Sequence, residues 1–539
     1  MAETPWWQQK IIYQIYPMSF CDSNGDGIGD LAGIISRLDY LQKLGVGALW
    51  LSPVYPSPNK DNGYDISDYC NIHPNYGTLE QMDTLIAEAK KRDIRIIMDL
   101  VINHTSNQHE WFQKSRRRIA PYTDFYIWRK GENGKKPTNW GNFFGGDCWE
   151  FDEERGEYYL HLFAKEQPDL NYHNEAVIEA IENVMRFWLD RGVAGFRCDV
   201  INIIYKEAIK NGKWRPALTG SEYYLSTPGC HRVLHRLYTD VLSQYNAFTV
   251  GETVFVTPKM ADDLVNPARG ELSTVFAFEH METDCYKIKW FLRRFNPDRF
   301  FSCITKWQQQ LPWNTVYLEN HDQPRSVSRY GNDTKYHDES AKALATLVLT
   351  LRGTPFLYEG QEIGMTNFDF PDMQKVRDVE SINIWNIGKR LHLPRSLRWR
   401  MIKTKSRDNA RTPMQWNDSP NAGFTTGTPW LSVNGNYPRI NAARQENDPN
   451  SVLSYYRRLI AFRNGSELLQ AGGFTRLFLG NGVYAYRREL NGEGLTVVVS
   501  LAAEERPNPV SGTVVLSNYD RTEAPQRLAP YEALILQEG

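Results

Sequence analysis

The chain has 539 residues, 41% hydrophobic and 23% charged, so it can bury a large core and form two or three domains. Its 62 lysines and arginines nearly balance 64 aspartates and glutamates, which disfavours nucleic acid and membranes as partners. No apolar run approaches the ~18 residues of a membrane span and no signal peptide is evident, so we expect a soluble, cytoplasmic protein. The sequence leaves open whether it is a monomer or a homo-oligomer.

The seven cysteines are scattered along the chain without a CxxC pair. Their odd number and their spacing fit neither a disulfide framework nor a zinc site. We therefore expect ordinary free thiols.

Short apolar runs of strand type recur along the chain with helical patterns between them, which is typical of βα units in a parallel sheet. Eight runs predict strands: residues 11–16, 48–52, 94–100, 195–200, 248–251, 274–278, 316–318 and 354–358. Between the third and the fourth, Val177, Ile181, Val184 and Trp188 share one helical face, and Gly192 marks the end of that helix. Eight such units predict an α/β fold, the (β/α)₈ TIM barrel, whose active site lies at the C-terminal strand ends.

Two segments do not fit this repeat. Residues 105–174 are too long for a βα loop and rich in Gly, Asn and aromatic residues, which predicts an inserted subdomain at the barrel mouth. From about residue 467 the apolar pattern has period two, which predicts a C-terminal antiparallel, sandwich-like β domain over residues 467–539. The barrel is then expected to comprise residues 1–104 and 175–466.

Acidic residues close several of the predicted strands. Asp199 ends the fourth strand, Glu252 follows the fifth and Asp322 follows the seventh. Like charges gathered in one cavity repel one another, and this cost is tolerated chiefly where it serves a reaction. A retaining glycosidase needs two carboxyl groups ~5 Å apart, one to attack the anomeric carbon and one to protonate the departing oxygen. Arg197 points to the same side of its strand as Asp199, so we expect it to keep Asp199 ionised.

The segments around these residues resemble the conserved segments of the α-amylase family (glycoside hydrolase family 13). They are DLVINH (99–104), GFRCDV (195–200), GET (251–253) and ENHDQPR (319–325). The resemblance implies Asp199 as nucleophile, Glu252 as general acid/base and Asp322 as a third carboxylate that binds sugar hydroxyls. The hydroxyl-binding or charge-setting neighbours that it implies are His104, Arg197 and His321.

Further segments are similar to the oligo-1,6-glucosidase and α-glucosidase branch of that family. They are NGYDISDY (62–69), FFGG (143–146), QPDLN (167–171) and SRDNARTPMQW (406–416). In that branch Asp61 and Arg411 help to close a pocket for one glucose and Tyr64 stacks on its ring. The residues implied at the entrance are Phe144, Phe163 and Gln167. A closed pocket of this kind implies exo action.

The resemblance therefore predicts a retaining, exo-acting α-glucosidase acting on small α-glucosides, with no cofactor for catalysis. Val200 follows the nucleophile, and valine there goes with a preference for α-1,6 links, so we expect hydrolysis of isomaltose-type oligosaccharides. Residues 251–260 lack the Pro-Gly that commonly follows the acid/base, which leaves the preference for the leaving group open. The alternatives are an α-1,4-glucosidase, a sucrose hydrolase or a transglucosylase of the same family. Outside enzymes, the alternative is a catalytically inactive relative that acts as a partner protein.

A loop after the first strand alternates oxygen-bearing residues with glycines over residues 22–30. It is not an EF-hand, because Gly33 stands where a bidentate glutamate is required. The glucosidase branch carries a similar loop, and the resemblance implies one structural Ca²⁺. The implied ligands are the side chains of Asp22, Asn24, Asp26 and Asp30 and the carbonyl of Ile28. The alternative is a set of Asx turns that cap their own backbone without metal.

Overall fold

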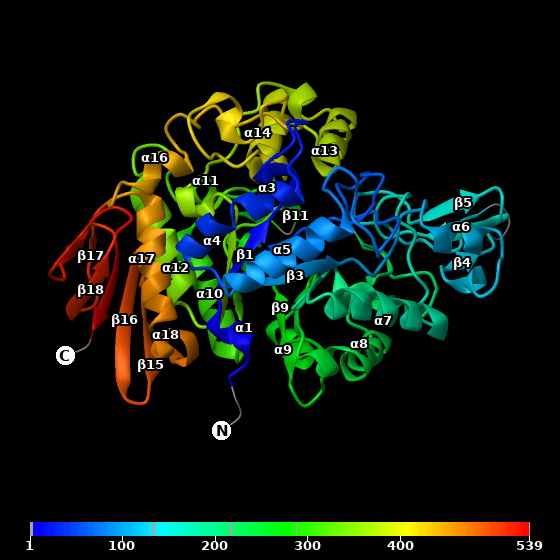
Figure 1. Ribbon diagram of the computed structural model, residues 1–539, viewed down its shortest axis with the longest axis horizontal. Helices are drawn as coiled ribbons and strands as arrows, with labels where there is room; N and C mark the ends of the chain where they lie inside the picture. Colours follow the sequence, from blue (N-terminus) through cyan, green and yellow to red (C-terminus); the bar gives the residue numbers. More distant parts are fainter. Residues whose placement is uncertain (1–3, 132–134, 216–217, 287, 538–539) are drawn as a thin grey trace. The chain divides into compact units, whose positions relative to one another are not determined.

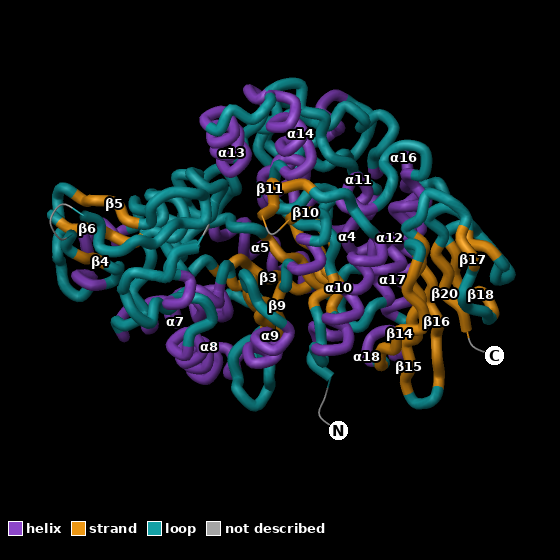
Figure 2. The backbone as a smooth tube through the Cα atoms, turned by 180° about the vertical axis from the view of Figure 1, so that it is seen from behind, coloured by secondary structure: helices purple, strands orange, loops and turns teal. Residues whose placement is uncertain are grey.

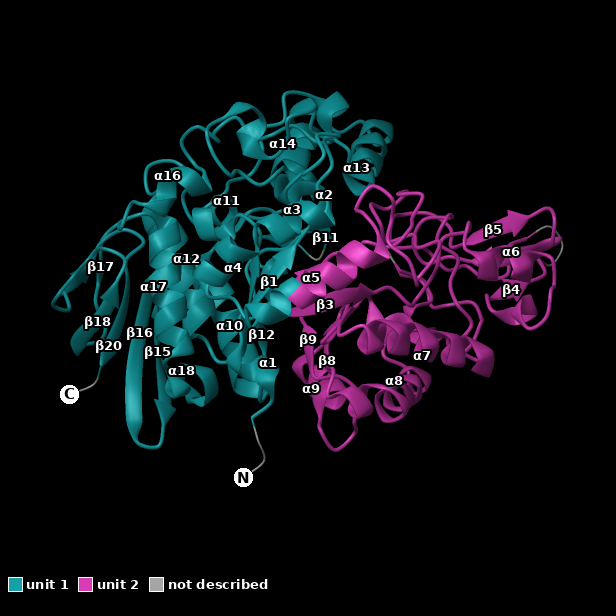
Figure 3. Cartoon of the chain, in the orientation of Figure 1, with its two compact units in different colours: residues 1–49, 88–94, 278–539 teal, residues 50–87, 95–277 magenta. Residues whose placement is uncertain are grey.

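The computed structural model describes residues 4–131, 135–215, 218–286 and 288–537 (Figure 1). Figure 2 shows the same chain coloured by helix, strand and loop. The chain divides into two compact units (Figure 3). Unit 1 comprises residues 1–49, 88–94 and 278–539, and unit 2 comprises residues 50–87 and 95–277.

Eight strands form the parallel sheet of a (β/α)₈ barrel, in the order β12-β13-β1-β2-β3-β7-β8-β9. Their bounds are β1 Ile12–Ile15, β2 Ala48–Leu51, β3 Arg95–Leu100, β7 Gly195–Cys198, β8 Phe248–Glu252, β9 Thr274–Phe276, β12 Thr315–Val316 and β13 Thr354–Tyr358. Each of them overlaps one of the eight runs expected from the sequence. The predicted strands and the predicted fold are therefore confirmed.

Within unit 1, β13 pairs in parallel with both β1 and β12. Every residue of β1 and β13 is buried, and their side chains are mainly apolar, with Gln14 and Thr354 as the polar exceptions. The longer helices of this unit are α4 (Leu38–Leu44), α10 (Pro297–Gln310), α12 (His337–Thr350), α13 (Val379–Arg390), α14 (Arg395–Lys405) and α17 (Val452–Asn464). Its shorter helices are α1 (Trp6–Gln9), α2 (Pro17–Phe20), α3 (Leu31–Ser36), α11 (Ser326–Tyr330), α15 (Asp408–Arg411), α16 (Ala442–Glu446) and α18 (Glu467–Ala471).

Within unit 2, β3, β7, β8 and β9 pair in parallel in that order. The helices are α6 (Glu110–Arg116), α7 (Glu175–Asp190), α8 (Pro228–Asp240) and α9 (Pro258–Val265), and α5 (Leu79–Lys91) begins in this unit. α7 is the helix predicted before the fourth strand. Asn174 caps its N-terminus, and Gly192 follows its end with a φ of 99°, so the predicted end is confirmed.

Two further antiparallel sheets lie where the sequence breaks the βα repeat. After β3, three strands form a sheet in the order β4-β6-β5: β4 (Trp128–Arg129), β5 (Trp149–Asp152) and β6 (Glu157–Leu160). Near the C-terminus five strands follow the order β14-β15-β16-β20-β18: β14 (Gly473–Gly480), β15 (Val483–Leu490), β16 (Glu493–Ser500), β18 (Thr513–Ser517) and β20 (Ala533–Gln537). The turn between β15 and β16 is made by Asn491 and Gly492, both with positive φ, as Asn-Gly hairpin turns require. The domain boundaries stay a prediction.

The segment after β13 contains two helices that pack on each other. α13 and α14 pack around an apolar cluster that includes Val376, Met401 and Ile402, with Trp385 and Trp399 at its edge. The short ribbon of β10 (Cys285–Tyr286) and β11 (Ile288–Leu292) adds Trp290 to this cluster.

All seven cysteines are free thiols, as predicted. Among the described residues, no helix has the length and apolarity that a membrane crossing requires. The cytoplasmic location stays a prediction.

Candidate active site

Arg197 is the centre of a buried charged cluster in unit 2. It lies on β7, and the strand register sets it beside Asp99 of β3. Its Nη1 donates to Asp99 Oδ1 at 2.8 Å and to Asp199 Oδ1 at 2.6 Å, and its Nη2 donates to Glu252 Oε2. One fixed cation therefore contacts carboxylates from the ends of three neighbouring strands.

The strand ends bring Asp199 and Glu252 side by side. Asp199 follows β7 directly, and its backbone N–H donates to Leu100 O at 3.0 Å. Glu252 is the last residue of β8, and its carboxylate and that of Asp199 both accept from the guanidinium of Arg197. A side chain at Gly251 would put its Cβ 2.7 Å from Leu272 Cδ1, so a glycine is needed just before Glu252. The two residues predicted to carry the reaction thus share one site.

The protonation of this cluster differs from the expectation. Burial raises the pKa of Asp199 well above its ordinary value, and Glu252 and Asp99 raise it further against the pull of Arg197. Burial likewise raises the pKa of Asp99 to about 6. The direction of this shift opposes the expectation that Arg197 keeps Asp199 ionised, because burial outweighs the attraction of one guanidinium, which three carboxylates share. The cluster therefore holds a proton to higher pH than an isolated carboxyl group would.

Val200 has a strained backbone next to Asp199. Its φ of 36° and ψ of 40° lie in the left-handed region, which β-branched residues rarely adopt. This conformation brings its N–H to 3.4 Å from Glu252 Oε2. Its side chain is buried in the cluster that includes Leu162 and Ile203, with Phe163 packed against it.

A second group of predicted residues forms a polar network around Gln167. Gln167 Nε2 lies 3.0 Å from His104 Nε2 and 3.3 Å from Asp61 Oδ2. The Tyr64 hydroxyl donates to Asp99 Oδ2 at 3.2 Å, which joins this network to the charged cluster. Burial lowers the pKa of His104 to about 4, so its imidazole is neutral at neutral pH.

An aromatic group borders this network. The ring of Phe163 lies 5.1 Å from that of His104, measured between centroids, and it stacks on Phe143 at 4.9 Å. Phe144 meets Phe163 edge-on at 5.7 Å. The structure thus brings together all ten site residues that the sequence predicted in unit 2, which are Asp61, Tyr64, His104, Phe144, Phe163, Gln167, Arg197, Asp199, Val200 and Glu252.

The remaining predicted residues form a cluster of their own in unit 1. Arg411 Nη2 donates to Asp322 Oδ1 at 2.6 Å, and Arg411 Nε donates to His321 O at 3.0 Å. His321 Nε2 and Arg407 Nη1 lie 3.4 and 3.6 Å from the Asp322 carboxylate. Although burial opposes ionisation, His321, Arg407 and Arg411 together hold the pKa of Asp322 below its ordinary range. The His321 ring also stacks on that of Tyr16.

Sequence reasoning assigned no role to several residues of these clusters. Asp99 bonds Arg197 and Tyr64, and it also accepts from Trp50 Nε1 at 3.2 Å. A signal for Asp99 was present, since it ends a predicted strand beside the one that carries Arg197. Arg407 beside Asp322 had no such signal, because its position depends on the long segment after β13.

The loop predicted to bind calcium caps its own backbone. Asp22 Oδ1 accepts from Asn24 N and Gly25 N, and Asp26 Oδ1 accepts from Ile28 N. Asp30 caps α3 by accepting from Gly33 N. Within the ranges that the structure covers, no three His, Cys, Asp or Glu side chains are arranged to hold a metal ion. The Asx turns of the alternative are present, and the calcium site stays a prediction.

Comparison with known proteins agrees with this geometry. Residues 14–472 match the model of the alpha amylase catalytic domain. The oligo-1,6-glucosidase of Parageobacillus thermoglucosidasius is 47% identical, over 99% of both chains. Among solved structures, the isomaltulose synthase of Klebsiella sp. LX3 is 40% identical with a TM-score of 0.95, over 100% of both chains. The trehalose-6-phosphate hydrolase of Bacillus licheniformis is 42% identical with a TM-score of 0.93, over 99% of both chains. The resemblance found in the sequence is confirmed, and the chain belongs to the alpha-amylase family of glycoside hydrolases.

Proposed function

We propose that this enzyme is a retaining, exo-acting α-glucosidase in which Asp199 is the nucleophile and Glu252 the general acid/base. The observation that carries the proposal is that the single guanidinium of Arg197 contacts both carboxyl groups, through Nη1 to Asp199 and Nη2 to Glu252, which places them side by side. Retaining glycosidases have their two carboxyl groups ~5 Å apart, whereas inverting enzymes leave room for a water molecule between them.

The proposed reaction uses the proton held by this pair. Asp199 attacks the anomeric carbon while Glu252 gives its proton to the glycosidic oxygen, so the C–O bond breaks and a glucosyl-enzyme forms. Glu252 then takes a proton from water, whose oxygen attacks the same carbon and displaces Asp199. Glucose leaves with its original α configuration, and Glu252 holds the proton for the next cycle.

The other residues are proposed to bind the glucose. Tyr64 and the neutral His104 offer an aromatic face and a ring nitrogen, and the Phe144 and Phe163 pair suits the entrance. Asp322, Arg411 and His321 would bind sugar hydroxyls. Arg411 supports this role, because its Nη1 is buried with no hydrogen-bond partner in the part of the chain that the structure describes. A bound hydroxyl would satisfy that donor.

The linkage is proposed to be α-1,6, with isomaltose-type oligosaccharides as substrates. Two observations support it: Val200 follows the nucleophile, and the Parageobacillus relative named above is an oligo-1,6-glucosidase. The sugar-transferring alternatives stay open, because an isomaltulose synthase is also a structural relative. Turnover and product analysis on isomaltose, maltose, sucrose and trehalose 6-phosphate separates these functions.

The roles of the two carboxyl groups are tested by azide rescue with an activated aryl α-glucoside. Asp199→Gly should lose activity by a factor on the order of 10⁴ and regain turnover with azide, forming the β-glucosyl azide. Glu252→Ala should form the α-glucosyl azide, because azide then attacks the β-linked glucosyl-enzyme. Glu179→Ala, a change at an exposed glutamate on α7, is the matched control and should keep full activity. Identical products from the two active-site variants, or an active Asp199→Gly enzyme without azide, would refute the assignment.

The loop of Asp22, Asn24, Asp26, Ile28 and Asp30 is proposed to hold one structural Ca²⁺. Its donors are all oxygens, the ligand type that calcium prefers. A Ca²⁺ ion bound there would stabilise the fold and would take no part in the reaction.

A further inference from the structure

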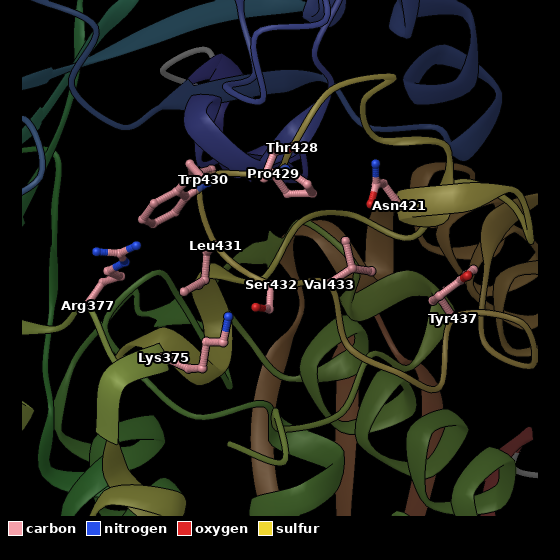
Figure 4. Close-up of a pocket in the computed structure, with 10 residues that line it drawn as sticks. All are labelled: Lys375, Arg377, Asn421, Thr428, Pro429, Trp430, Leu431, Ser432, Val433 and Tyr437. Atoms are coloured by element: carbon pink, nitrogen blue, oxygen red, sulfur yellow. The ribbon is translucent and has the colours of Figure 1, made fainter. Parts of the chain in front are cut away.

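A cavity in unit 1 lies outside both clusters described above (Figure 4). Its volume is about 420 Å³, within the ~300–1,000 Å³ typical of small-molecule sites. Its walls come from two segments, one with Lys375 and Arg377 and the other with Trp430 and Ser432. None of the predicted site residues lines it, so it is a separate feature of the molecule.

One wall of the cavity is positively charged and carries no compensating acid. Lys375 and Arg377 are both exposed, and neither side chain has an ion pair or hydrogen bond with a residue of the described ranges. Val376 between them is buried in the cluster under α13 and α14, and the Arg377 N–H donates to Asp408 Oδ2 at 2.7 Å. The backbone of residues 375–377 is therefore held in place, while the side chains of Lys375 and Arg377 are available to bind a ligand. No aspartate or glutamate of the described ranges lines the cavity.

The opposite wall is aromatic and held in place. The Trp430 indole donates to Ser19 Oγ at 3.0 Å, and its backbone N–H donates to Gly27 O at 2.9 Å. A Cβ at Gly27 would lie 1.9 Å from Thr428 O, so the two loops approach as closely as a glycine permits. Figure 4 shows Lys375 and Arg377 on the side of the cavity that faces the segment of Trp430, Leu431 and Ser432.

The segment packed beneath the cationic wall is basic in sequence. Residues 389–407 contain eight lysines and arginines and no acidic residue. They include α14, whose Met401 and Ile402 pack with Val376 directly beneath the cationic wall. Three of these cations are paired with acids in the fold, Lys403 with Asp369, Lys405 with Asp284 and Arg407 with Asp378, so the positive charge at the cavity is that of Lys375 and Arg377.

We propose that this cavity binds a hexose phosphate. The two cations suit a phosphate dianion, which Arg and Lys bind with charge-assisted hydrogen bonds. The fixed indole suits the apolar face of a pyranose ring. Ser432, Asn421 and Tyr437 line the remainder and offer hydroxyl and amide groups for the sugar hydroxyls.

The test is calorimetric titration of the full chain with glucose 6-phosphate while 1-deoxynojirimycin saturates the active site, so the result does not depend on the proposed reaction. Wild-type protein should bind one equivalent. Lys375→Gln/Arg377→Gln should lower the affinity at least about tenfold and leave glucosidase activity unchanged. The matched control is Lys389→Gln/Arg390→Gln, which removes two exposed cations from the end of α13 and should bind like wild type. Inorganic phosphate and glucose should each bind about tenfold more weakly than glucose 6-phosphate.

Several outcomes would overturn the proposal. Absence of binding by wild type, or equal loss in the two double variants, would mean that no specific anion site exists. Glucose binding as tightly as its phosphate would make the cavity a neutral sugar site. If inorganic phosphate bound as tightly as glucose 6-phosphate, the sugar would contribute nothing to binding, and the cavity would not be a hexose phosphate site.

Discussion

Arg197 Nη1 donates a 2.6 Å hydrogen bond to Asp199 Oδ1, two residues further along the chain. The same nitrogen also donates to Asp99 on the neighbouring strand β3. The same guanidinium contacts Glu252, so its planar fork sets the spacing of the proposed nucleophile and acid/base.

Arg197→Lys should lower kcat for an aryl α-glucoside by about 10²–10³-fold with a smaller change in KM, because an ammonium group cannot contact all three carboxylates. Arg191→Lys is the matched control, since Arg191 pairs with Asp83 at the surface. Steady-state kinetics measure both. Wild-type kcat in the Arg197 variant would show that the fork does not set the geometry.

The pH dependence of kcat/KM should have an alkaline limit that follows the raised pKa of Asp199. Asp99 contributes to the raised pKa of Asp199, so Asp99→Asn should move this limit to lower pH. Asp83→Asn, a change at the surface, should leave the profile in place. A limit that stays fixed or moves to higher pH in the Asp99 variant would contradict this electrostatic coupling.

Asp199 should lower the stability of the fold at neutral pH. Its pKa is raised on folding. In the unfolded chain this carboxyl group therefore loses its proton in the usual pH range of an aspartate, whereas in the folded chain it keeps the proton to higher pH. Stability is therefore lost as pH rises from the ordinary carboxyl range toward the folded pKa. Asp199→Asn should raise Tm by about 1–3 °C at pH 8 and by less near pH 4. Calorimetry at the two pH values checks this, and a lower Tm at pH 8 would count against it.

Val200→Ala should shift linkage preference while activity is retained. The smaller side chain leaves space in the cluster beside Asp199, and under the proposed α-1,6 preference this space should admit α-1,4-linked substrates. We expect the ratio of kcat/KM for isomaltose to that for maltose to fall about tenfold. Ile203→Val, one methylene smaller in the same cluster, is the control for a general packing defect. An unchanged ratio in the Val200 variant would remove the support that this residue gives to α-1,6 specificity.

Chelation should lower Tm if the loop of residues 22–30 holds calcium, because a ligand bound only to the folded state stabilises it. Readdition of Ca²⁺ should restore Tm and give a single binding event by titration calorimetry. Asp26→Ala should abolish both effects. A Tm that is indifferent to chelator and metal would mean that the Asx turns alone stabilise the loop.

The sequence alone was sufficient for the barrel and for the residues that carry the proposed chemistry. Buried parallel strands require continuous apolar runs such as 354–358, and the acidic residues that close them stand out from this pattern. The Asn491-Gly492 turn is also a local feature, since few residues accept its backbone angles. These features are local, so a short stretch of sequence is enough to predict each of them.

Tertiary structure decided what depends on contacts between distant segments. Only the folded chain buries Asp199 and divides the charge of Arg197 among Asp99, Asp199 and Glu252, and burial is the main reason that the pKa of Asp199 is raised. The packing of Val376 against α13 and α14 holds Lys375 and Arg377 at the same cavity as the indole of Trp430, which the sequence does not indicate. The physical reason is that electrostatic and packing energies depend on distances in space, which spacing along the sequence does not fix.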